Sequence, residues 1–156
     1  MDSVIRDVAV KILKKNWRKN IWRKNWRHID NIAKKNRYCS IQKKIPNRTW
    51  FQPYNHSRKY ITTITRLRFG HACYPTHLHK IRVLENDRCP NCDKKADLDH
   101  ISFECQKYKN ETDRFIQQLH RLKIPAPFNI LSILANGQES MYNALVMFLS
   151  STKIVL

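Results

Sequence analysis

Four side chains that bind zinc in proteins lie within 17 positions of one another in this 156-residue chain. Two residues separate Cys89 from Cys92, and seven separate Cys92 from His100. Cys105 follows after four more. Two cysteines at the first spacing can bend around one ion, and a helix-borne histidine and cysteine can then complete a tetrahedron. Because the segment has few apolar residues of its own, an ion would be needed to hold it together. The sequence therefore predicts one Zn²⁺ ion bound by these four side chains.

The predicted zinc site is structural rather than catalytic, since four protein ligands leave no position open for water. Three thiolates, one neutral imidazole and one dication sum to a charge of −1. Arg88, Lys94 and Lys95 lie close in sequence, where they can offset this charge and favour the thiolate form. The alternative interpretation is that the cysteines are ordinary buried residues and that the histidine belongs to the core.

The cysteine count and the distribution of apolar residues bear on the compartment. The chain has five cysteines, an odd number, and no long apolar run follows its basic start as a secretory signal would require. This combination favours reduced thiols and metal ligation over a disulfide framework. The most apolar stretch, residues 141–149, is shorter than the roughly 20 residues that span a bilayer. We therefore expect an intracellular protein without a membrane span.

The positive charge is concentrated in one part of the chain. Residues 1–82 contain 21 of the 30 Lys and Arg residues and only three acids, whereas residues 83–156 carry nine of each sign. The formal net charge of +18 therefore belongs to residues 1–82. A field of this size attracts polyanions, which are nucleic acids or anionic membrane surfaces.

A segment rich in tryptophan and cations lies within the basic part. Residues 4–36 contain no proline or glycine and carry apolar residues mostly at helical separations, which predicts one long basic helix. Aromatic residues interleaved with cations are typical of single-strand binders, which combine phosphate contacts with base stacking. The alternative is that the tryptophans dock this helix onto the rest of the protein. The predicted nucleic-acid contacts are Lys14, Lys15, Trp17, Arg18, Lys19, Trp22, Arg23, Lys24, Trp26, Arg27, Arg66 and Arg68.

The expected fold is mainly α: a small helical module with a short zinc-stapled Cys-Cys-His-Cys loop, preceded by the long basic helix. Pro46 and Pro53 bracket a stretch that has the character of a loop. We therefore expect a basic, Trp-rich helical segment over residues 1–45, a linker loop over residues 46–57, and a helical zinc-binding domain over residues 58–156.

Three helices are expected in the zinc-binding domain. In residues 58–69, Ile and Leu recur every three positions, which favours a helix ending at Gly70, although three threonines leave a strand open. Asn110 is expected to cap a second helix, which two prolines end. A third helix is expected over residues 139–149.

A second group of potential metal ligands, His71, Cys73, His77 and His79, is expected on one loop. Histidines in a basic surface loop are more often hydrogen-bonding groups or phosphate contacts than metal ligands. No carboxylate falls between residues 30 and 85, which weakens the idea of a magnesium-dependent nuclease because two-metal hydrolysis needs acidic ligands. A histidine-dependent nuclease is the enzymatic alternative.

Several motifs occur in a recognisable order. They are Arg-Lys-Tyr-Ile-Thr-Thr-Ile-Thr-Arg-Leu-Arg-Phe-Gly-His at residues 58–71, Thr-His-Leu-His at 76–79, Cys-Pro-Asn-Cys at 89–92 and Asp-Leu-Asp-His-Ile-Ser-Phe-Glu-Cys at 97–105. This order resembles the carboxy-terminal tail of insect non-LTR (LINE-type) retrotransposon reverse transcriptase polyproteins. In that family the tail follows a reverse transcriptase and often a ribonuclease H domain, and ends in a Cys-Cys-His-Cys zinc knuckle. The resemblance covers most of the chain and implies a nucleic-acid-binding role.

The chain also departs from that family. The Tyr-x-Asp-Asp motif of reverse transcriptase does not occur, and we find no endonuclease or ribonuclease H core. Seven residues separate the second cysteine from the histidine, whereas the short retroviral knuckle has four. We therefore interpret the chain as a fragment of such a polyprotein and expect it not to be an enzyme.

Together these observations predict a zinc-binding module that binds single-stranded RNA or DNA through its basic half. We expect no small-molecule substrate, and a location in the nucleus or in a cytoplasmic ribonucleoprotein. The alternatives are an inert remnant of a retroelement, a nuclease that uses His71, His77 and His79, and a basic helix that lies on an anionic membrane surface.

Overall fold

The computed structural model describes residues 13, 16–17, 20–21, 37–42, 48–53 and 55–154. The chain divides into two compact units, residues 1–47 and 48–156. The expected mainly helical fold is confirmed, since the described residues form helices and, within these ranges, only one isolated β-bridge.

Most of the predicted long basic helix lies outside the described residues. In the first unit, Leu13, Asn16, Trp17, Asn20 and Ile21 have a helical backbone, and helix α2 spans Arg37–Ile41. The Trp17 side chain is 65% exposed. The other predicted contacts of this segment lie outside the described residues, and they are Lys14, Lys15, Arg18, Lys19, Trp22, Arg23, Lys24, Trp26 and Arg27.

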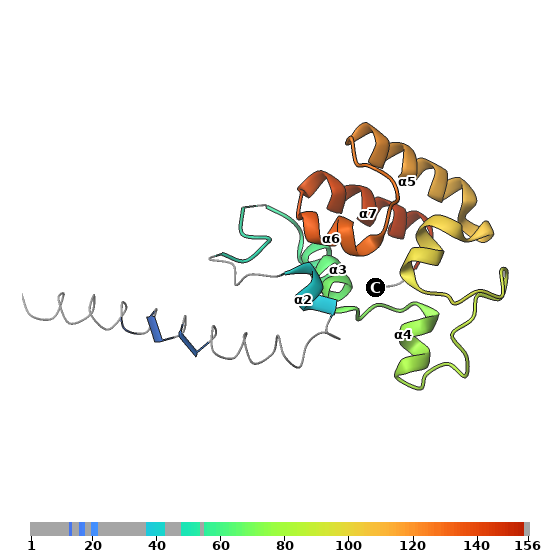
Figure 1. Ribbon diagram of the computed structural model, residues 1–156, viewed down its shortest axis with the longest axis horizontal. Coiled ribbons are helices and arrows are strands. Elements are labelled where there is room, and N and C mark those ends of the chain that lie inside the picture. Colours follow the sequence, from blue (N-terminus) through green and yellow to red (C-terminus); the bar gives the residue numbers. More distant parts are fainter. Residues whose placement is uncertain are drawn as a thin grey trace, which may run out of the picture. The chain divides into compact units, whose positions relative to one another are not determined.

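The second unit contains five α-helices, shown in Figure 1. Their bounds are Arg58–Phe69 for α3, Pro75–Lys80 for α4, Lys109–Arg121 for α5, Ile130–Asn136 for α6 and Glu139–Ser151 for α7. A π-helical turn, His100–Glu104, and a short 3-10 turn, Gln106–Tyr108, lie between α4 and α5. Of the helices described here, none has the length and apolar character needed to cross a bilayer.

Helix α3 forms where the sequence predicts it. The Ser57 hydroxyl accepts a hydrogen bond from the amide of Tyr60 at 3.3 Å, which satisfies one of the free donors of the first turn. Gly70 ends the helix in the left-handed conformation, with a φ of 75°. Ile64 and Leu67 are fully buried on one face, as the three-residue apolar spacing requires.

The structure corrects three local expectations. Helix α5 starts at Lys109, so Asn110 lies inside its first turn and is not its cap. Residues 75–80 form the short helix α4 rather than part of the loop expected around His71–His79. Pro75 begins this helix, because proline is favoured at the first helical position, where no amide donor is needed. Helix α6 was not expected, although Asn129 caps it by accepting a hydrogen bond from the amide of Ser132 at 2.7 Å.

The core of the second unit lies between α3, α5, α6 and α7. Helix α5 packs on α7, and α3 packs on both α6 and α7. Stacked rings of Phe115 and Phe148, with centroids 5.1 Å apart, join α5 to α7. The largest fully buried side chains in the described residues are Tyr142, Phe115, Ile64, Leu67, Leu119, Ile130, Ile133, Leu134, Met141, Leu145 and Ser102.

Arg68 is part of this core, and the expectation that it contacts nucleic acid is wrong. Its side chain is only 3% exposed. The guanidinium donates to the carbonyl of Leu134 at 3.0 Å and to the hydroxyl of Tyr142 at 2.7 Å. A buried charge with such partners is costly to move into water. Arg68 therefore ties α3 to α6 and α7, whereas Arg66 on the same helix is exposed.

Residues 48–57, which the sequence predicts as part of a linker, belong to the second unit. The Trp50 ring packs edge-on against Tyr142, with centroids 5.3 Å apart. The guanidinium of Arg68 lies 6.0 Å from the centroid of the same ring. The aromatic anchor of this loop thus covers the buried arginine.

We predict that Tyr142→Phe lowers the free energy of unfolding by about 1.5–3 kcal/mol, because it removes a hydrogen bond to a buried charged group. It also removes the bond that the hydroxyl donates to the carbonyl of Leu134 at 2.9 Å. Urea unfolding followed by circular dichroism measures the change. The matched control is Tyr60→Phe, which removes an exposed 2.7 Å bond to Asn143 and should cost less than about 1 kcal/mol. Equal losses in the two variants would contradict the assigned role of Arg68.

Candidate metal centre

The structure brings together all four sequence-predicted metal ligands. The ligand atoms of Cys89, Cys92, His100 and Cys105 all lie within 4.8 Å of one another. The Sγ atom of Cys105 is 3.7 Å from that of Cys89 and 4.0 Å from that of Cys92. A zinc–sulfur bond of about 2.3 Å gives a sulfur–sulfur edge of about 3.8 Å in a tetrahedron. The thiols therefore already have the spacing of ligands around one ion.

The first two ligands lie on a tight turn. The amides of Cys92 and Asp93 donate to the carbonyl of Cys89, at 3.3 and 2.9 Å. The amide of Cys89 donates to the carbonyl of Lys94 at 2.7 Å, which closes the turn from the other side. Asp93 adopts a positive φ of 50°, a conformation that Asp tolerates better than most residues. This backbone turns both thiols toward the same point.

The other two ligands are placed by the π-helical turn His100–Glu104. The amide of Cys105 donates to the carbonyl of His100 at 2.8 Å, five residues back. In a regular α-helix, side chains five residues apart point about 140° away from each other. A wider turn with bonds between residues five apart brings them closer to one face. The Asp97 carboxylate steadies the start of this turn by accepting a hydrogen bond from the amide of His100 at 2.9 Å.

The His100 imidazole is buried without a hydrogen-bond partner. The side chain is 4% exposed, and within the described residues neither ring nitrogen has a partner. Buried polar atoms are nearly always satisfied, because an unpaired one costs the full loss of its hydration. A metal ion at the centre of the cluster would satisfy the nitrogen that faces the thiols. The residues present therefore fit a metal ion on the evidence of their own burial.

The ionisation of the thiols points the same way. Burial raises the pKa of Cys89, but contact with the His100 imidazole and hydrogen bonds at the backbone of Asn91 and Cys92 and at the Cys105 thiol outweigh burial and lower this pKa to about 7. Burial, with the neighbouring Cys89 and Cys92 thiols, raises the pKa of Cys105 to about 11, despite a hydrogen bond at the backbone of Lys107. One thiolate thus makes the next harder to form, and a divalent cation removes this penalty.

A second layer of polar contacts surrounds the ligands. The Glu104 carboxylate lies 3.7 Å from Nδ1 of His100 and 3.0 Å from Nζ of Lys94. The hydrogen bond and charge of Lys94 lower the pKa of Glu104, and contact with His100 adds to this, so the carboxylate is ionised at neutral pH. A carboxylate beside Nδ1 favours the tautomer in which Nε2 is free to bind a metal. Glu104 is not among the sequence-predicted site residues, although its position four residues after His100 is a signal for this role.

Apolar packing around the ligands is slight. The buried cluster at this place consists of Cys89, Ala96 and Cys105, with Cys92 and Tyr108 packed against it. No large aliphatic side chain belongs to it. The immediate surroundings of the thiols are therefore poor in apolar packing, whereas Leu98 and Ile101 in the same segment are buried.

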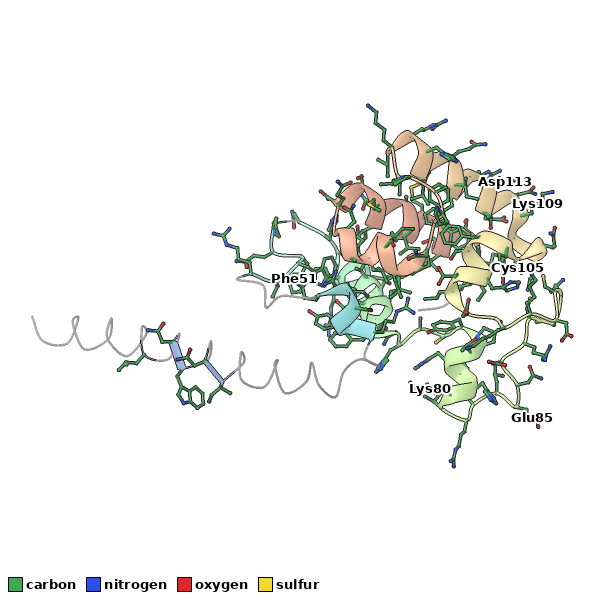
Figure 2. The ribbon with its side chains drawn as sticks, viewed as in Figure 1. Phe51, Lys80, Glu85, Cys105, Lys109 and Asp113 are labelled. Atoms are coloured by element: carbon green, nitrogen blue, oxygen red, sulfur yellow. The ribbon has the colours of Figure 1, made fainter. Side chains whose placement is uncertain are left out.

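Contacts with α5 and α6 connect the metal-binding segment to the helical core. The Asp99 carboxylate accepts a hydrogen bond from the amide of Ile130, the first residue of α6, at 2.7 Å. The ring of Phe103, inside the π-helical turn, stacks on Phe115 of α5 with centroids 5.7 Å apart. Figure 2 labels Cys105 between this turn and the start of α5.

The donor set decides which metal suits the site. Three thiolates and one imidazole in a tetrahedral arrangement are typical of zinc. The described cysteines, Cys73, Cys89, Cys92 and Cys105, are all free thiols. Since four side chains surround the centre, no coordination position is left for a substrate or a reactive water. The arrangement can hold one metal ion and suits a structural role.

The rival group of His71, Cys73, His77 and His79 is not assembled as a metal site. Among the residues that the structure describes, the Cys-Cys-His-Cys cluster is the only group of three or more potential ligands close enough to share an ion. The Nδ1 atom of His79 lies 3.1 Å from the carbonyl of Leu84, and Cys73 is exposed.

Comparisons with protein-family models, with curated proteins and with solved structures found no match for this chain.

We predict that the purified chain retains one zinc ion and that Cys105→Ser abolishes this retention, because the variant loses the thiol that lies beside both other cysteine ligands. Atomic emission on gel-filtered protein measures the metal content. Cys73→Ser is the matched control, since it removes an exposed thiol outside the cluster, and it should retain one ion. Zinc retained equally by both variants would refute the assignment.

We predict that Glu104→Gln lowers zinc affinity about tenfold, because outer carboxylates that orient a ligating histidine have effects of this size. Competition with a chromophoric chelator measures the affinity. The control is Glu111→Gln, the same substitution in the first turn of α5, which should leave zinc affinity unchanged. A Glu104 variant that binds zinc as tightly as the original chain would exclude this role.

Proposed function

We propose that the protein is a nucleic-acid-binding module whose fold is held by one structural Zn²⁺ ion. The observation that carries this proposal is how charge and metal ligands are distributed along the sequence. Residues 1–82 carry the whole net charge of +18, whereas residues 83–156, which contain all four ligands, are neutral overall. A zinc-stabilised part thus adjoins a polycationic part.

The folded unit itself contributes to the basic part. Residues 58–82 contain six Lys or Arg residues and no acid. Arg68 is used in the core, but Arg66, Lys80 and Arg82 are exposed. Exposed cations attract phosphates irrespective of base sequence. This supports a module that binds the nucleic-acid backbone with little choice of sequence.

The proposed partner is single-stranded RNA or DNA. The 65% exposure of Trp17 supports this choice, because exposed aromatic rings among cations act as stacking platforms for unpaired bases. In the proposal, the cations of residues 14–27 contact phosphates, and the zinc ion orders the second unit. No catalytic step is assigned to the protein, so incubation with labelled RNA should leave the RNA intact.

We also propose that the chain derives from the tail of a non-LTR retrotransposon polyprotein. The support is the motif order described above, from residues 58–71 through the Cys-Cys-His-Cys cluster. Such an origin fits a protein that acts in the nucleus or in a cytoplasmic ribonucleoprotein.

We predict that a labelled single-stranded oligouridylate binds the zinc-loaded chain with a steep salt dependence. Seven phosphate contacts, each contributing about 0.7 to 0.9, give a slope of log affinity against log salt of about −5 to −6. Fluorescence anisotropy across a potassium chloride series measures this slope. A flat response would refute nucleic-acid binding through the basic part.

A second arm of this experiment tests the role of zinc. Chelation of the metal should weaken binding, because the second unit then loses its arrangement. The Cys105→Ser variant should behave like the chelated chain, and Cys73→Ser like the zinc-loaded one. Equal binding in all arms would show that the basic segment acts as a bare polycation, as the inert-remnant alternative requires.

A further inference from the structure

Two imidazole rings stack on each other at the junction of α3 and α4. The centroids of His71 and His77 are 5.3 Å apart, and their planes differ by 21°. His71 follows the left-handed Gly70, and its amide donates to the carbonyl of Arg66 at 2.8 Å. His77 lies in α4, where its amide donates to the carbonyl of Tyr74 at 3.0 Å. Both rings are therefore held by hydrogen-bonded backbone.

The ring pair lies close to the cation Lys80, and the next acid along the sequence is Glu85. Burial lowers the pKa of His77, and the positive potential of His71 and Lys80 lowers it further. His77 and Lys80 lie three positions apart on one face of α4, and the His77 ring stacks on that of His71. Among the described residues, carboxylates pair with Arg88 and Lys94, but no ion pair involves His71, His77 or Lys80. A bound phosphate would offset the charge of Lys80 and accept hydrogen bonds from the imidazole N–H groups.

An aromatic surface continues from this cluster. The Phe69 side chain is 48% exposed, and its ring centroid is 6.5 Å from that of His71. The exposed Arg66 lies in the same last turn of α3. Flat rings beside cations suit a ligand that alternates bases and phosphates, and single-stranded nucleic acid has this pattern.

We infer that His71, His77 and Lys80 form a phosphodiester-binding site for single-stranded nucleic acid, with Phe69 as a neighbouring base-stacking surface. This inference rests on the proposed function and gives it a defined site within the folded unit. The site holds phosphate by charge and by imidazole N–H donors, and no bond is made or broken. It uses none of the metal ligands and none of residues 14–27.

The nearby loop makes a lipid surface the alternative that must be tested. Ile81, Val83 and Leu84 are exposed beside Lys80 and Arg82. Apolar side chains flanked by cations also bind anionic bilayers. We favour nucleic acid because the stacked imidazoles and Phe69 offer flat ring faces on which unpaired bases can stack.

The test uses the zinc-loaded full chain and a fluorescein-labelled oligouridylate in a salt series. Lys80→Gln should weaken binding about fivefold at low salt and reduce the magnitude of the salt slope by about 0.7, the contribution of one phosphate contact. His77→Gln should also weaken binding. The matched control is Lys109→Gln, which removes the same charge from an exposed position in α5, and it should change neither quantity. Figure 2 shows Lys80 and Lys109 far apart on this unit.

Two further measurements separate the possible failures. In nuclear magnetic resonance spectra, the ring signals of His71 and His77 should shift when oligouridylate is added, while the His120 signals stay in place. Vesicles of phosphatidylserine and phosphatidylcholine, sedimented at the same salt, should bind the original chain and Lys80→Gln to the same extent.

If the original chain binds oligouridylate with a steep slope, but Lys80→Gln and His77→Gln bind it as tightly as the original chain, the inference is wrong and the proposed function stands. If the original chain does not bind at all, both are wrong. Loss of vesicle binding in Lys80→Gln, without loss of oligouridylate binding, would assign the surface to a membrane.

Discussion

The crowding of three thiols around one buried imidazole is the constraint on which the second unit depends. The thiols of Cys89 and Cys105 are 3.7 Å apart, and ionisation of the first opposes ionisation of the second. Without a cation, the segment would keep a protonated Cys105, whose pKa is raised to about 11, and an unsatisfied His100. A divalent ion reverses each of these penalties at once, since it stabilises thiolates and supplies a partner for the ring nitrogen.

The same segment connects α4 to the start of α6. The amide of Thr76 in α4 donates to the carbonyl of Ala96, which belongs to the metal-binding cluster, at 3.3 Å. At its other end, Asp99 holds the amide that begins α6. Loss of the ion would therefore loosen both the short helix that carries His77 and the start of α6. This is the physical reason why metal removal and nucleic-acid binding should be linked in the proposed function.

Local signals were enough to predict some features and not others. The cysteine spacing, the apolar spacing in α3 and the glycine after it depend on neighbouring residues, so the sequence revealed them. The π-helical turn is harder to foresee, because four residues between His100 and Cys105 suit one ion only when the helix widens. The burial of Arg68 was beyond sequence reasoning, since its partners Leu134 and Tyr142 lie 66 and 74 positions away.

Arg66 and Arg68 show why charge alone does not define a binding surface. Both are arginines of α3, but side chains two positions apart in an α-helix point in directions that differ by about 160°. Arg68 therefore turns inward to the hydroxyl of Tyr142, and Arg66 faces solvent. The side of α3 that does not pack on α6 and α7 is the side on which cations remain available. The turn at Gly70 leads from the end of α3 toward α4. The packing of α3 on the core therefore decides where the exposed cations Arg66 and Lys80 lie.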